Sequence, residues 1–143
     1  MNRLLEYITH HPLLVAAAAI LAVIAIVIEA RTRARGSNAL SPVDVVRLLN
    51  SGALMLDVRA GSEFAAGHII DARNVPAAEI ATRADSLKKY KEKPVILCCD
   101  SGLASSTAAR TLQTLGFAKI ATLQGGLRAW KQENLPLVKD SGK

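Results

Sequence analysis

Cysteine is scarce in this sequence of 143 residues: there are two, Cys98 and Cys99, and they are adjacent. Adjacent cysteines can bridge each other only through a strained small ring, and a disulfide framework needs partners at a distance. The composition therefore excludes a small fold held together by disulfides. We expect both thiols to be reduced, as they are on the cytoplasmic side of a membrane.

Aromatic residues are also few, at 3% of the chain, although the formal net charge is +6. Proteins that bind single-stranded nucleic acid stack the bases on aromatic side chains, and this chain has no such platform. The basic run at residues 88–91 could touch nucleic acid or anionic lipid, but it fits better as the solvated end of a helix. We therefore expect no nucleic-acid partner.

Charge is absent from residues 12–28, which read PLLVAAAAILAVIAIVI. A helix of this length spans about 26 Å, close to the ~30 Å hydrocarbon core of a bilayer. Arginines follow at positions 31, 33 and 35, and positive charge beside a membrane helix marks its cytoplasmic end. The pattern predicts a single helix that spans a membrane, so the membrane is the expected partner of this segment.

Two other interpretations of this apolar run were weighed against a membrane span. A buried core helix would need protein around all its faces, and the remaining domain of about 100 residues is small for that. A cleaved signal peptide would end at a small-residue cleavage site, whereas Glu29 and the arginines follow here. We therefore predict an N-terminal tail at 1–11, a single-pass transmembrane helix at 12–28, and a basic linker at 29–39 that leads to a cytoplasmic domain.

After the linker, strand patterns alternate with helix patterns. We expect strands at 53–58, 72–75, 95–98 and 119–123, and helices at 42–50, 62–66, 79–91, 105–115 and 127–130. This alternation favours parallel pairing of the strands, and hence an α/β fold with layered helices and sheet. Ligands of such sheets gather where strands end and helices begin, which is where the two cysteines lie.

Cys98 and Cys99 end the apolar run VILCC and are followed by the small residues of a loop. Side chains alternate along a strand, so we expect Cys98 to face away from Cys99 and to fill the core. Cys99 is expected to begin the loop, where backbone amides ahead of the next helix favour an anion or a thiolate. These residues alone leave two interpretations open, an inert cysteine and a reactive one.

Segments on both sides of the cysteines resemble signatures of the rhodanese-like domain family. Residues 56–76, LDVRAGSEFAAGHIIDARNVP, resemble its first signature, and residues 116–138, GFAKIATLQGGLRAWKQENLPLV, resemble its closing segment. The matching residues are Asp57, Val58, Arg59, Glu63, Phe64, Gly67, His68, Ile69, Ala72, Asn74 and Pro76 in the first, and Gly125, Gly126, Ala129, Trp130 and Pro136 in the second. The resemblance covers residues 40–138 and leaves a C-terminal tail at 139–143.

The resemblance implies an open parallel sheet flanked by helices, with Cys99 as the catalytic residue. The family's cysteine takes a sulfane sulfur from a donor, carries it as a persulfide and passes it to a nucleophilic acceptor. The family needs no metal and no organic cofactor. The implied active-site loop consists of Asp100, Ser101, Gly102, Leu103, Ala104 and Ser105. The resemblance names neither the donor nor the acceptor, and proteins can serve as both.

The loop departs from the family pattern in its charge. Many active members carry a basic residue after the cysteine and an arginine at the end of the loop, where this chain has Asp100 and Ala104. An acid beside the thiol disfavours the thiolate and repels a dianionic donor such as thiosulfate. A related family of cysteine phosphatases places an arginine where this chain has Ser105, so that chemistry would lack its bidentate donor.

Two functions from different classes therefore remain open. The first is a membrane-anchored sulfurtransferase or persulfide carrier that uses Cys99. The second is a non-catalytic rhodanese-like module that binds a partner at the inner membrane surface. In both cases the expected location is the bacterial inner membrane, with the domain at 40–138 in the cytoplasm.

Four charged or titratable residues of the first signature could suggest an acid/base site: Asp57, Arg59, Glu63 and His68. Networks of such residues are often structural, and we expect these four to tie the loops to the sheet. They are therefore predicted to support the site without reacting.

Overall fold

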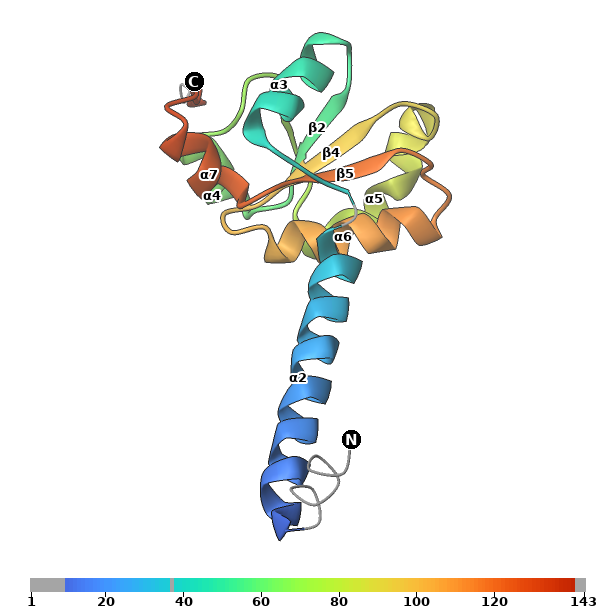
Figure 1. The fold of residues 1–143 in the computed structure, drawn as a ribbon. Helices are drawn as coiled ribbons and strands as arrows, with labels where there is room; N and C mark the ends of the chain where they lie inside the picture. The colour runs from blue at the N-terminus through green and yellow to red at the C-terminus, as the bar shows by residue number, and fades with distance from the viewer. Residues whose placement is uncertain (1–9, 37, 141–143) are drawn as a thin grey trace. The chain divides into compact units, whose positions relative to one another are not determined.

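A computed structural model describes residues 10–36 and 38–140 of the chain (Figure 1). The chain divides into two units, with the boundary between residues 37 and 38. The first contains helix α2 (Pro12–Gly36), whose segment Pro12–Glu29 is long and apolar enough to cross a membrane. A signal sequence would pass the same test of length and composition. Most large apolar side chains of this segment, among them Leu13, Leu21 and Ile28, are exposed, unlike those of a core helix.

Helix α2 does not end at Ile28, where the apolar run ends, but continues to Gly36. Residues 29–36 of the predicted linker are therefore helical. Alanine and arginine are strong helix formers, and no proline interrupts them, so the helix propagates until glycine ends it. Strand β1 (Ala39–Leu40) begins at the last residue of the predicted linker and was not predicted from the sequence.

The second unit is built on a five-stranded sheet in which every described pairing is parallel. Its strands are β1, β2 (Leu54–Asp57), β3 (Arg73–Asn74), β4 (Val95–Cys98) and β5 (Ile120–Leu123), in the order β1-β5-β4-β2-β3. Strands β2 and β4 are buried along their whole length, as their continuous apolar sequences require. The predicted α/β fold with an open parallel sheet is confirmed.

Four helices connect successive strands, and a fifth follows the last strand: α3 (Pro42–Asn50), α4 (Gly61–Ala66), α5 (Ile80–Arg83) and α6 (Leu103–Thr114), and then α7 (Gly126–Gln132). The start of α3 is as predicted, since Ser41 caps it by accepting a hydrogen bond from the Asp44 amide. The single helix predicted at 79–91 is instead α5 between two 3₁₀ segments, η1 (Ala77–Glu79) and η2 (Ala84–Tyr90). Hydroxyls there bond carbonyls three residues back, which competes with α-helical hydrogen bonding.

Apolar clusters fill both faces of the sheet, and the helices cover them in two layers (Figure 1). Helices α5 and α6 pack on one face, and α3 and α7 pack on the other. Along β4 the side chains alternate, so Leu97 and Cys99 belong to the first cluster while Ile96 and Cys98 belong to the second. The prediction that the two cysteines face opposite sides is confirmed.

Candidate active site at the end of β4

Cys99 follows the last residue of β4, the central strand of the sheet, and is 4% exposed. Gly102 ends the turn after it with a φ of 98°, a left-handed conformation that favours glycine. Helix α6 then begins at Leu103, two residues earlier than the sequence indicated. Three residues predicted for the loop, Leu103, Ala104 and Ser105, therefore form the first turn of the helix, because the tight turn at Gly102 needs no further chain.

The sulfur of Cys99 contacts two groups of this turn. The Gly102 amide donates a hydrogen bond to Sγ at 2.9 Å, and the thiol lies 3.5 Å from Ser105 Oγ, to which it donates. The Ser105 hydroxyl, which is fully buried, donates in turn to the Gly102 carbonyl at 3.1 Å. The bond from the Gly102 amide strengthens when the sulfur becomes an anion, so the turn is suited to a thiolate or a persulfide anion.

Backbone hydrogen bonds from the start of α7 hold the loop that carries Cys99. The Leu127 amide donates to the Cys99 carbonyl at 2.9 Å, and the Arg128 amide donates to the Asp100 carbonyl at 3.2 Å. Gly126 makes this approach possible, since a Cβ there would lie 2.5 Å from both loop carbonyl oxygens. Its φ of 62° is also a glycine conformation. Gly126, the second glycine of the pair in the closing segment, is therefore needed for steric reasons. The sequence indicated it only as part of a motif.

Asp100 and Arg128 also meet through their side chains. Arg128 Nε donates to Asp100 Oδ2 at 2.9 Å, and both side chains are largely accessible, at 71% for the arginine and 46% for the aspartate. No local sequence pattern indicates this contact, because the partners are 28 positions apart and belong to different elements. The acid beside Cys99 therefore has a cationic partner across the loop.

Asp57 and Arg59 form a buried ion pair at the end of β2. Arg59 Nη2 lies 2.6 Å from Asp57 Oδ2 and also donates to the Gly67 carbonyl at 2.7 Å. Burial alone lowers the Arg59 pKa, but the hydrogen bond and the charge of Asp57 raise it above its usual value. This pair joins the end of β2 to the turn after α4, and its hydrogen bonds do not go to Cys99.

Glu63 and His68 form separate local contacts. Glu63 accepts a hydrogen bond from the Ala60 amide at the start of α4. His68 Nδ1 lies 2.8 Å from the Phe64 carbonyl, and the two rings stack with centroids 3.8 Å apart. His68 also pairs through its backbone with Val138, which ties the C-terminal segment to the turn after α4. The four residues of the first signature are thus spread over several contacts rather than gathered at the sulfur.

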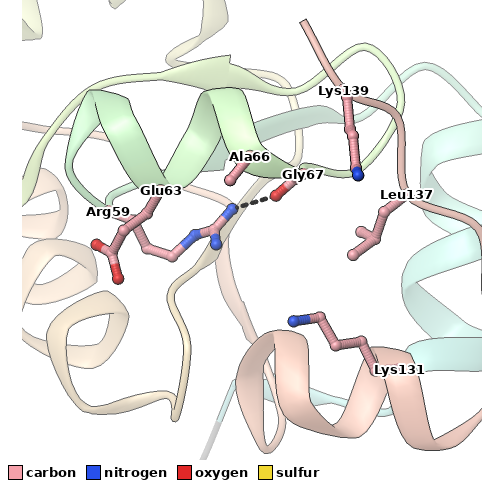
Figure 2. A pocket seen from close by; sticks show the side chains of 7 residues that line it. All are labelled: Arg59, Glu63, Ala66, Gly67, Lys131, Leu137 and Lys139. Atoms are coloured by element: carbon pink, nitrogen blue, oxygen red, sulfur yellow. Dashed lines mark hydrogen bonds between the residues drawn. The ribbon is translucent and has the colours of Figure 1, made fainter.

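A cavity of about 280 Å³ lies between α4, α7 and the C-terminal segment (Figure 2). Its lining consists of Arg59, Glu63, Ala66, Gly67, Lys131, Leu137 and Lys139. The ammonium groups of Lys131 and Lys139 point into this space in Figure 2, and Arg59 is held at its wall by the bond to Gly67. The loop that carries Cys99 does not line it.

Cys98 differs from Cys99 in its surroundings. It is fully buried, and burial raises the pKa of its thiol well above its usual range, with the nearby charge of Asp57 adding to the effect. Cys98 is therefore a neutral thiol that packs against the α3 and α7 layer. Among the residues that the structure describes, no three His, Cys, Asp or Glu side chains are grouped to hold a metal ion.

Comparison with known proteins assigns the chain to a family. Residues 41–133 match the model of the rhodanese-like domain, and the chain belongs to this family. The parallel sheet and the motifs on either side of the cysteines agree with this assignment, so the predicted membership is confirmed.

Relatives and solved structures extend the comparison. The uncharacterized protein YibN of Escherichia coli K12 is 32% identical over 141 residues, which cover 97% of this chain and 99% of YibN. The thiosulfate sulfurtransferase GlpE of Pseudomonas fluorescens is 36% identical over 92 residues, 63% of this chain and 81% of GlpE. The human single-domain sulfurtransferase TSTD1 is 29% identical with a TM-score of 0.58, covering 68% of this chain and 98% of that one. Sulfurtransferases are therefore among the proteins that this chain resembles.

Proposed function

We propose that this protein is a sulfurtransferase or persulfide carrier that holds sulfane sulfur on Cys99. The observation that carries the proposal is the Gly102 amide, which donates to Cys99 Sγ in a turn at the carboxyl end of the central strand. Similarity to proteins named sulfurtransferases gives independent support. The burial and raised pKa of Cys98 leave Cys99 as the nucleophile of the pair.

The reaction proceeds in two displacement steps. The Cys99 thiolate attacks the outer sulfur of a donor such as thiosulfate, a new S–S bond forms, and sulfite leaves with the electron pair of the broken S–S bond. A nucleophilic acceptor then attacks the outer sulfur of the persulfide, and the Cys99 thiolate leaves. The amide of Gly102 stabilises the anionic sulfur at each stage, and the hydroxyl of Ser105 can turn from the Gly102 carbonyl to donate to it.

The apolar helix is proposed to anchor this activity to a membrane. Segment Pro12–Glu29 crosses the bilayer in this account, and the arginines at 31, 33 and 35 place the following domain on the cytoplasmic side of the inner membrane. A site at the membrane surface suits sulfur exchange with other proteins. The proposed donor and acceptor are therefore proteins, with thiosulfate as a small-molecule substitute in assays.

A steady-state assay on the full chain in detergent tests the catalytic proposal. Thiosulfate is the donor, cyanide is the acceptor, and thiocyanate formation is measured for the parent, Cys99→Ser and Cys98→Ala. We expect Cys99→Ser to lose transfer and Cys98→Ala to keep it, since the side chain of Cys98 packs in the apolar cluster under α3 and α7. Equal activity in the parent and Cys99→Ser would overturn the assignment of the nucleophile. A folded parent that transfers sulfur from neither thiosulfate nor a protein persulfide would favour the partner-binding module.

A further inference from the structure

The residue that follows Cys99 is held by α7 through both its backbone and its side chain. The Arg128 amide donates to the Asp100 carbonyl, and Arg128 Nε donates to Asp100 Oδ2 at 2.9 Å. An exposed ion pair contributes little to stability, and here the backbone bond already holds the two residues together. The side-chain pair is therefore not needed to keep the loop in place.

Only one of the three guanidinium nitrogens of Arg128 takes part in the ion pair. Nε is the nitrogen that faces the carboxylate, and among the residues that the structure describes neither Nη1 nor Nη2 of Arg128 has a hydrogen-bond partner. The side chain is 71% exposed, so these terminal nitrogens face solvent beside the residue next to Cys99. A guanidinium in this state can bind an oxyanion through two parallel hydrogen bonds.

We propose that Arg128 determines the specificity of the site for anionic sulfur donors. It cancels the charge of Asp100 and offers its terminal nitrogens to the oxyanion end of the incoming donor. This inference rests on the proposed role of Cys99, and it replaces the expectation that the loop repels anions. The cation that the loop lacks at Ala104 is supplied from α7.

The local charge can be measured without any sulfur transfer. We would modify the full chain in detergent with two methanethiosulfonates, one bearing an anionic sulfonate and one a cationic trimethylammonium, and follow the adduct on Cys99 by mass spectrometry. The ratio of the anionic to the cationic rate reports the charge beside the thiol. The variants are Arg128→Gln, Asp100→Asn and the double variant. The control is Arg47→Gln, which removes an exposed arginine paired with Asp44 on α3.

The proposal predicts opposite effects for the two single variants. Arg128→Gln lowers the rate ratio by about three- to tenfold, because one unit charge is removed at a distance of several ångströms. Asp100→Asn raises it by a similar factor, the double variant returns near the parent, and Arg47→Gln changes nothing. A ratio that Arg128→Gln leaves unchanged while its circular dichroism matches the parent would overturn the proposal.

Sulfate binding provides a second measurement that needs no reaction at the buried thiol. Sulfate is a dianion that resembles thiosulfate, and its dissociation constant is read from chemical-shift changes of the Gly102 and Arg128 amides. We expect Arg128→Gln to weaken this binding at least about threefold, as the loss of a bidentate donor requires. Absence of sulfate-dependent shifts at these amides in the parent would contradict the proposal. If both measurements behave as predicted but the parent transfers no sulfur, the charge assignment stands and the proposed catalytic function fails.

Discussion

The hydroxyl of Ser105 lies 3.5 Å from the sulfur of Cys99 and is fully buried in the first turn of α6. It donates to the Gly102 carbonyl, and so does the next residue, Ser106, at 2.8 Å. The two serines thus bond the same acceptor, but Ser105 also contacts the sulfur. Comparing variants of the two serines therefore separates the effect of a hydroxyl on the turn from its effect on the sulfur of Cys99.

The first prediction uses this pair. Ser105→Ala is expected to slow sulfur transfer by about three- to tenfold, because the hydroxyl can turn from the Gly102 carbonyl towards an anionic sulfur. Ser106→Ala is expected to leave the rate within about twofold of the parent. Each change costs about 1 kcal/mol of stability through its lost hydrogen bond. Equal rates for the two variants, measured by single-turnover transfer, would show that the hydroxyl does not act on the sulfur.

The second prediction concerns the contact between α7 and the loop. Gly126→Ala places a Cβ against the Cys99 and Asp100 carbonyl oxygens and is expected to displace the loop. The control is Gly52→Ala, which shares the positive φ but has open space around the added Cβ. Both variants pay about 1 kcal/mol or more of backbone strain. Only Gly126→Ala should also lose sulfur transfer, and normal activity in that variant would contradict the described contact.

The third prediction follows from the raised pKa of Cys98, which is due first to burial and then to Asp57. The folded protein holds this proton more tightly than the unfolded chain, so its contribution to stability is complete below about pH 8.5 and falls as the pH rises towards the folded pKa. Cys98→Ala should remove that fall, which approaches ~1.4 kcal/mol per pH unit for one proton. Urea unfolding of residues 38–143, which contain both apolar clusters, measures it between about pH 7 and pH 10. Parallel pH profiles for the parent and Cys98→Ala would refute the assignment.

The fourth prediction concerns the membrane and is tested with an added cysteine. Gln113 is exposed on α6, so Gln113→Cys in a background of Cys98→Ala and Cys99→Ser gives a single accessible reporter. A membrane-impermeant maleimide applied to intact bacterial cells should not label it, whereas opened cells should allow labelling. Labelling of intact cells would reverse the proposed orientation. A mature chain that lacks residues 1–28 by mass would identify the apolar segment as a cleaved signal.

Much of the fold could be predicted from the sequence because its signals are local. The run at 95–98 is apolar without interruption, as expected of a strand buried on both faces, and Ser41 and Pro42 mark a helix start by their own chemistry. Asp71, which lies within the first signature, has a φ of 59°, in the left-handed region that aspartate tolerates. Strand β1 was not predicted, because two residues show no hydrophobic periodicity and because its pairing with β5 is a long-range contact.

The position of the candidate site could be predicted from the sequence, but the pairing of its charged side chains could not. Alternation along β4 separates Cys98 from Cys99, and that inference needs only neighbouring residues. The pairing of Asp100 with Arg128 depends on how α7 packs against the loop, which no local pattern encodes. The same holds for Gly126, whose need for a missing Cβ arises from carbonyls in a distant segment. A count of charge along the loop alone therefore leaves out the arginine that pairs with Asp100.

The central claim, that Cys99 carries sulfane sulfur, is tested most directly by the mass of the intact protein after exposure to thiosulfate and removal of the excess. The account predicts an added mass of about 32 Da, one sulfur atom, in the parent and in Cys98→Ala, with fragment ions placing it on residue 99. Cyanide should remove this sulfur, and Cys99→Ser should never acquire it. An adduct that persists in Cys99→Ser, or one that fragment ions place on Cys98, would contradict the claim.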